Sequence, residues 1–257
     1  MSTCIVCGQS PTIEAHLMPK ALARYVGRDQ PRNISISKDR IKTGSLGEYD
    51  PDILCRTCDQ ILGKLDEVAF NLCRNFARDH VRKPGRLFVN PRIDGQAISK
   101  FILSVLWRCS VSNRRRIANF NIKEHEKAIE DILFHGKPLE EFTGLQIYLM
   151  AWKARRNDPS KVFTYPERLN LPGKDIVSFL IPRFRVNVIF NGGVENPDVL
   201  KQLAVNYSKV ARGFFIPFED SAELNAMRET VESLTRQGKN SISRRATAPA
   251  PKLLPSS

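Results

Sequence analysis

The stretch Leu54-Cys55-Arg56-Thr57-Cys58, together with Cys4-Ile5-Val6-Cys7 near the start of the chain, decides the expected fold of the N-terminal third. Two C-x-x-C pairs in a chain without a secretory signal are typical of a tetrahedral zinc site, because a reducing compartment keeps thiols available as ligands. We expect a structural zinc ion bound by four cysteines: Cys4, Cys7, Cys55 and Cys58. A redox-active C-x-x-C is the weaker alternative, because a thioredoxin-like site needs one pair between a strand and a helix.

The composition is that of a globular protein. The chain has 257 residues, of which 42% are hydrophobic and 26% are charged, as in ordinary water-soluble domains. Its longest apolar runs are of strand length, far short of the roughly 20 residues that span a bilayer. The first residues contain no apolar segment typical of a secretory signal. We therefore expect a cytoplasmic protein without a membrane segment.

The charge balance favours nucleic acid as the partner. The chain carries 40 Lys and Arg against 27 Asp and Glu, a formal net charge of +13. Such an excess attracts polyanions, and DNA is the expected partner, although the same charges also suit a protein whose basic surface only keeps it soluble. The basic side chains expected to contact phosphates are Arg108, Arg114, Arg115, Arg116, Lys153, Arg155 and Arg156. Neither charge nor composition indicates an oligomeric state.

Hydrophobic periodicity predicts an α+β fold. Apolar residues spaced three and four apart after Cys58 predict an amphipathic helix over residues 56–78. Further helices are predicted over residues 98–109, 123–135, 139–153, 197–206 and 220–236. Short strands are predicted over residues 34–37 and 86–89, and a hairpin over residues 176–181 and 185–190. We expect Cys73, Cys109 and Trp107 in the core. The expected organisation is a zinc-binding module at residues 1–80, an α+β accessory domain at residues 81–236 and a disordered basic tail at residues 237–257.

A histidine stands between the two cysteine pairs, in Ala15-His16-Leu17-Met18-Pro19-Lys20. The order of zinc pair, His-x-x-Pro, long loop, zinc pair and helix resembles the HNH endonuclease family, whose zinc-stabilised members have a treble-clef (ββα-metal) fold. Together with Leu103-Ser104-Val105-Leu106-Trp107-Arg108, these motifs also look like a group of bacterial and phage proteins with a His-Ile-Ile-Pro-type motif, often labelled HNH-like.

This resemblance implies metal-dependent hydrolysis of DNA phosphodiester bonds. His16 would act as the general base on a water molecule. A divalent ion such as Mg²⁺ or Mn²⁺ would polarise the scissile phosphate. Oxygen atoms are the ligands such ions prefer, and the candidate ligands are Asp59, Asp66 and Glu14.

Departures from the family pattern leave a second function open. Ala15 stands where many members have a metal-ligating residue, and Asp59 stands where the family has an asparagine. The alternative is therefore a catalytically degenerate treble-clef protein that binds nucleic acid or a protein partner. In such a protein Asp59 would serve only as a favourable charge in the first turn of its helix.

Overall fold

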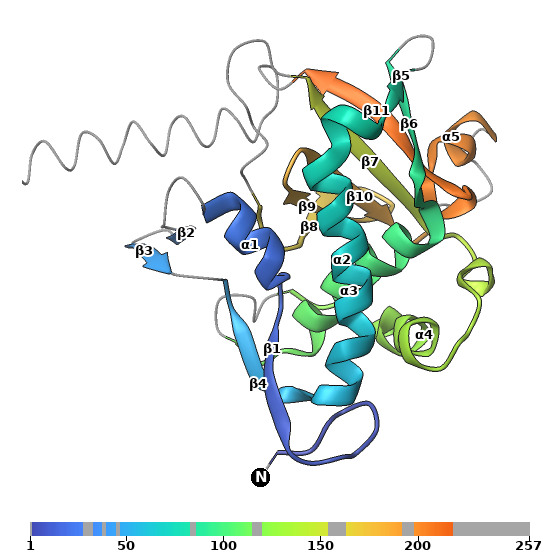
Figure 1. Cartoon of the computed structure of the whole chain (residues 1–257). Helices are drawn as coiled ribbons and strands as arrows, with labels where there is room; N and C mark the ends of the chain where they lie inside the picture. Colours follow the sequence, from blue (N-terminus) through green and yellow to red (C-terminus); the bar gives the residue numbers. More distant parts are fainter. Residues whose placement is uncertain are drawn as a thin grey trace, which may run out of the picture. The chain divides into compact units, whose positions relative to one another are not determined.

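The computed structural model describes residues 2–27, 33–37, 40–44, 47–82, 86–114, 120–153, 163–191 and 198–217 (Figure 1). The chain divides into a unit Met1–Ile216 and a unit Pro217–Ser257, and the first is described below. The helix expected over residues 220–236 and the tail expected over residues 237–257 lie outside the described residues. Helices and strands both contribute substantially to the first unit, in agreement with the expected α+β class.

The N-terminal part begins with a pair of strands that leads into a long helix. β1 (Thr12–His16) pairs antiparallel with β4 (Tyr49–Cys55), and β4 continues directly into α2 (Arg56–Asp79). Figure 1 shows this strand pair with α2 rising from the end of β4. Along the chain, three further elements come between β1 and β4. They are α1 (Lys20–Gly27), β2 (Asn33–Ser37) and β3 (Arg40–Gly44). β2 and β3 pair antiparallel, which confirms the strand predicted over residues 34–37.

Helix α2 confirms the helix predicted over residues 56–78. Asp59 in its first turn and Arg78 in its last turn complement the helix dipole. Its buried residues recur at helical spacing along one face, and they are Cys58, Leu62, Ala69, Leu72, Cys73 and Phe76. This face joins the main hydrophobic core, so α2 connects the strand pair to the rest of the unit.

A seven-stranded sheet forms the second half of the unit, in the order β5-β6-β11-β7-β10-β9-β8. Its strands are β5 (Val81–Arg82), β6 (Leu87–Asp94), β7 (Gln146–Lys153), β8 (Glu167–Leu171), β9 (Lys174–Ile181), β10 (Phe184–Ile189) and β11 (Val210–Pro217). β10 alternates buried and half-buried residues, the period expected of a strand. The antiparallel β9–β10 pair confirms the predicted hairpin, and β6 extends the strand predicted over residues 86–89.

The helix predicted over residues 139–153 is wrong. A single 3-10 turn, η1 (Leu139–Glu141), precedes β7, which lies inside the sheet between β11 and β10. Every residue from 145 to 151 is buried. A strand covered on both faces is apolar throughout, so it lacks the alternation that separates a strand from a buried helix. The helix predicted over residues 197–206 is shorter than expected, because α5 (Asp198–Leu203) gives way to the 3-10 turn η3 (Val205–Tyr207).

Helix α3 (Gly95–Val111) is the centre of the core. Asp94 caps its first turn by accepting from the backbone N–H groups of Gln96 and Ala97. The helix packs against α2 from the N-terminal part of the chain, and also against α4 (Lys123–Phe134) and β6. One hydrophobic core therefore continues across residue 80, the expected end of the zinc-binding module. Trp107 and Cys109 are fully buried, as expected. Among the helices described, none combines the length and the apolar character needed to cross a membrane.

Candidate metal centre and His16

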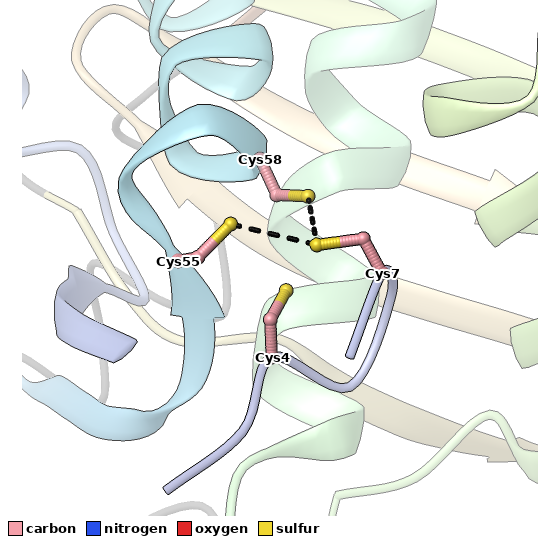
Figure 2. A group of neighbouring side chains, drawn as sticks. All are labelled: Cys4, Cys7, Cys55 and Cys58. Atoms are coloured by element: carbon pink, nitrogen blue, oxygen red, sulfur yellow. Dashed lines mark hydrogen bonds between the residues drawn. The ribbon is translucent and has the colours of Figure 1, made fainter. Parts of the chain in front are cut away.

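The two C-x-x-C pairs meet at the junction of three segments. Cys4 and Cys7 lie in the turn before β1, Cys55 ends β4, and Cys58 lies in the first turn of α2. Figure 2 shows all four side chains directed toward one another. Their sulfur atoms lie within 4.8 Å of one another. The Sγ atom of Cys7 is 3.6 Å from that of Cys55 and 3.6 Å from that of Cys58.

Backbone hydrogen bonds hold the turn that carries Cys4 and Cys7. The amide of Gly8 donates to the carbonyl of Cys4 at 2.8 Å, and the amide of Cys4 donates to the carbonyl of Gln9 at 2.9 Å. Gly8 has φ of 72°, a left-handed conformation that glycine adopts without steric cost. The amide of Ile5 donates to the carbonyl of Ile53 on β4 at 3.1 Å, which places the turn beside the other cysteine pair.

The cluster has the dimensions of a four-thiolate metal site. Zn–S bonds of about 2.3 Å in a tetrahedron separate the sulfurs by about 3.8 Å, close to the 3.6 Å found around Cys7. A disulfide would need about 2.05 Å, and all four cysteines are free thiols. Burial raises the pKa of the Cys58 thiol, whereas backbone N–H groups of Cys55, Cys7 and Val6 outweigh burial at Cys4 and bring its pKa to about 7. The four cysteines are therefore placed to bind a metal ion such as zinc.

A second cluster of ligand-type side chains joins α4 to β9. Glu124, His125 and Asp175 offer ligand atoms within 4.8 Å of one another. Arg168 donates to Asp175 at 2.9 Å and to Glu124 at 2.8 Å, so this cluster is already an ion-pair network. The ring of His125 also stacks on Phe190 at 4.2 Å between centroids. These contacts explain the cluster without a metal ion.

His16 ends β1 and is half-buried. Burial is the main cause that lowers the pKa of its imidazole below 6.5, and the charges of Lys20 and Arg108 lower it further. The ring is therefore neutral at pH 7 and able to accept a proton. Glu14 is exposed two residues earlier, on the same side of the strand, and its carboxylate opposes the lowering of the His16 pKa.

Arg108 is buried beneath His16, which corrects the expectation that it contacts phosphate. Only 1% of its side chain is exposed. Its Nη1 donates to the backbone carbonyl of His16 and to Oδ2 of Asp66, each at 3.1 Å, and its Nη2 donates to Oδ1 of Asp66 at 2.7 Å. Because both Asp66 oxygens are bound by Arg108, the buried guanidinium is paired with a carboxylate that is 19% exposed.

Within the described part of the chain, Asp59, the other predicted ligand on α2, is not paired as Asp66 is. Asp59 is half-buried, and burial is the main cause that raises the pKa of its carboxyl group. The nearby charges of Arg108 and Asp66 act on it in opposite directions. No hydrogen bond of the Asp59 carboxylate is found among the described residues, so it is more accessible to a cation than Asp66.

Of the predicted basic clusters, the structure describes mainly Arg114. Its side chain is 39% exposed and lies 3.9 Å from the buried carboxylate of Asp50. Lys153 ends β7, and its side chain lies outside the described part of the chain. Outside the described residues altogether are Arg115, Arg116, Arg155 and Arg156. The expected phosphate contacts of these residues stay predictions.

Two residues near His16 were not expected from the sequence. Tyr49 is the register partner of His16 across the β1–β4 pair, and Asp50 follows it. Asp50 accepts a hydrogen bond from Ser112 at the end of α3, at 2.6 Å. Only the strand register and the approach of α3 bring these residues to His16, and no local motif signals either one.

The chain matches no protein-family model, no curated protein and no solved structure. The likeness to HNH endonucleases therefore depends on the motifs alone. What the protein does has to be inferred from the chemistry of the cysteine cluster and of the side chains around His16.

Proposed function

We propose that the chain is a zinc-stabilised ββα-metal (treble-clef) protein that hydrolyses phosphodiester bonds in DNA, with His16 as the general base. The observation that carries the proposal is the position of His16. His16 has a neutral, half-buried imidazole and ends β1 of the β1–β4 pair. One cysteine pair precedes β1, and the other lies where β4 continues into α2. The order of turn, β1, β4 and α2 is compatible with such a fold, with α1, β2 and β3 inserted between β1 and β4.

Zinc has a structural role in this proposal. A two-stranded antiparallel pair is marginally stable by itself in water. An ion held by four thiolates joins the first turn of the chain to the start of α2, and leaves no open position for a substrate. The sulfur separations of 3.6 Å around Cys7 support this assignment.

Hydrolysis requires a second cation held by oxygen atoms. When bound, Mg²⁺, Mn²⁺ or a similar ion supplies charge stabilisation at the scissile phosphate. Asp59 and Glu14 are the candidate ligands from the sequence. Among the described residues they do not form a cluster with His16 in which three ligand atoms lie within 4.8 Å of one another, so binding of the cation would have to draw them together. Asp66 is withdrawn from the ligand set, because Arg108 binds both of its oxygens. His16 takes the proton of the attacking water.

The test is nicking of supercoiled plasmid by zinc-loaded protein in the presence of magnesium, manganese or nickel. We expect the wild type to nick the plasmid and His16→Ala to lose this activity while keeping its zinc. His135→Ala is the matched control, because His135 is a 46% exposed histidine after α4. Cleavage by His16→Ala at the wild-type rate would overturn the proposal.

A second function, binding of nucleic acid without hydrolysis, is favoured by two observations. Ala15 is buried and offers no ligand, and Asp66 is committed to Arg108. In that case no divalent ion gives cleavage of duplex or single-stranded DNA, although zinc is present at one ion per chain. DNA binding would still weaken as salt increases.

A further inference from the structure

Tyr49 is an exposed aromatic side chain directly across from His16. The two residues are register partners in the β1–β4 pair, and the centroids of their rings lie 6.1 Å apart. Tyr49 is 42% exposed. A single exposed tyrosine is ordinary on a protein surface. What distinguishes this one is its place beside the candidate general base and the cation that lies over its ring.

That cation is Arg114, whose guanidinium carbon lies 5.8 Å from the centroid of the Tyr49 ring. A short hydrogen-bonded framework holds it there. The buried carboxylate of Asp50 accepts from Ser112 Oγ at 2.6 Å and lies 3.9 Å from Nε of Arg114. The amide of Arg114 donates to the same Ser112 oxygen at 3.2 Å. These contacts anchor the backbone of Arg114 and place its guanidinium near Asp50, while 39% of its side chain is exposed.

We propose that Tyr49 and Arg114 form a nucleotide subsite that binds an unpaired base and its phosphate next to the phosphodiester presented to His16. This inference rests on the proposed function and specifies its substrate as a single-stranded segment of nucleic acid. Aromatic side chains stack on unpaired bases, whereas bases in a duplex already stack on one another. The guanidinium provides the complementary contact to the phosphate.

The contributions of Tyr49 and Arg114 to binding should depend differently on salt. Asp50 is a buried carboxylate beside Arg114 and offsets part of its charge. Charge contacts weaken as salt increases, whereas stacking on the ring is much less sensitive. The contribution of Tyr49 therefore persists at raised salt, and that of Arg114 declines.

The experiment measures binding of a fluorescein-labelled oligo(dT) of about 16 nucleotides by fluorescence anisotropy, with no magnesium or manganese added. A blunt duplex of the same length is the comparison probe. We expect the zinc-loaded wild type to prefer the single strand. Tyr49→Leu, which keeps an apolar side chain in the strand, should weaken that binding about 5- to 100-fold, while Tyr49→Phe retains it.

Matched controls separate this subsite from general basic or aromatic surface. Arg114→Gln should also weaken binding of the single strand, and more at low salt than at raised salt. Its control is Arg74→Gln, because Arg74 is an exposed arginine whose guanidinium lies 6.0 Å from the Phe70 ring. Tyr207 is 47% exposed on η3, so Tyr207→Leu controls for Tyr49→Leu. Neither control should change the preference for single strands. Zinc content and circular dichroism verify that each variant is folded.

The possible results separate this inference from the proposed hydrolysis. Wild-type affinity in folded Tyr49→Leu, or a preference for the duplex, overturns the subsite and leaves a nuclease with His16 intact. If Tyr49→Leu loses single-strand binding and the wild type nicks no DNA, the subsite is supported and the proposed hydrolysis is overturned. No binding of either probe by the wild type overturns the subsite directly.

Discussion

The guanidinium of Arg108 donates a hydrogen bond of 3.1 Å to the backbone carbonyl of His16, 92 positions away in the chain. The contact joins the last turn of α3 to the last residue of β1. It makes the position of His16 depend on the partly buried ion pair between Arg108 and Asp66 as well as on the strand pair. A helix far along the chain from β1 therefore helps to hold the residue on which the proposed chemistry depends.

Removing Arg108 alone should destabilise the protein strongly. Arg108→Met leaves the carboxylate of Asp66, which is 19% exposed, without its partner, and leaving a partly buried acceptor unsatisfied costs about 1–3 kcal/mol. Urea denaturation of the zinc-loaded protein measures this loss. The double variant Arg108→Met with Asp66→Leu should recover at least about 1 kcal/mol relative to Arg108→Met. A double variant less stable than either single one would show that the pair is not the cause.

Metal binding should depend on the four clustered cysteines and on no other cysteine. Cys58→Ser and Cys4→Ser should reduce zinc, measured by elemental mass spectrometry, from one ion per chain to a small fraction, because a thiolate ligand is lost. Cys73→Ala is the control, since Cys73 is a buried cysteine further along α2. It should lower stability but keep the zinc. Equal loss of zinc in Cys73→Ala would place the metal elsewhere.

His16 should make the protein less stable in mild acid. Its pKa in the folded protein lies below its ordinary value of 6.5, so the unfolded chain binds the proton more readily. This contribution to stability is fully present above pH 6.5 and is lost as the pH falls through the folded pKa. His16→Gln should therefore lose less unfolding free energy than the wild type between about pH 7.5 and 5.5. Equal losses in urea titrations at the two pH values would contradict this.

Asp59 and Asp66 should behave differently although both lie on α2. Asp59→Asn should reduce divalent-dependent nicking at least about tenfold while zinc and stability are nearly unchanged, because it removes a candidate oxygen ligand. Asp66→Asn should instead lower the urea midpoint, because it removes the charge that pairs with Arg108. Magnesium titrations of plasmid nicking, run beside denaturation curves, distinguish the two effects. The reverse pattern would assign the metal to Asp66.

Features set by neighbours in sequence could be predicted. The spacing inside each C-x-x-C pair indicated metal-binding cysteines, and the apolar period after Cys58 indicated α2, because each of these signals lies within a few residues. The β9–β10 hairpin is of the same kind, since a short turn joins its two strands. β7 was assigned wrongly, because its burial on both faces removes the periodicity on which such predictions depend.

Features set by tertiary contacts could not be predicted. Arginine is almost always found at the surface, so the sequence favoured a phosphate contact for Arg108. Its actual partner, Asp66, is 42 residues away and is brought to it by the packing of α2 on α3. Tyr49 beside His16 is likewise a result of strand register, which a chain with a long segment between its paired strands does not reveal locally.

The pairing of β1 with β4 also brings together the two ends of the segment between Leu17 and Glu48. Beyond the register pair of His16 and Tyr49, the amide of Leu17 donates to the carbonyl of Glu48 at 3.0 Å. The entropy lost on closing such a loop grows only slowly with its length. The chain between Leu17 and Glu48 can therefore be lengthened at little thermodynamic cost while both anchors stay in place. Insertion of a reporter domain after residue 37, where β2 ends, should be tolerated without displacing the histidine.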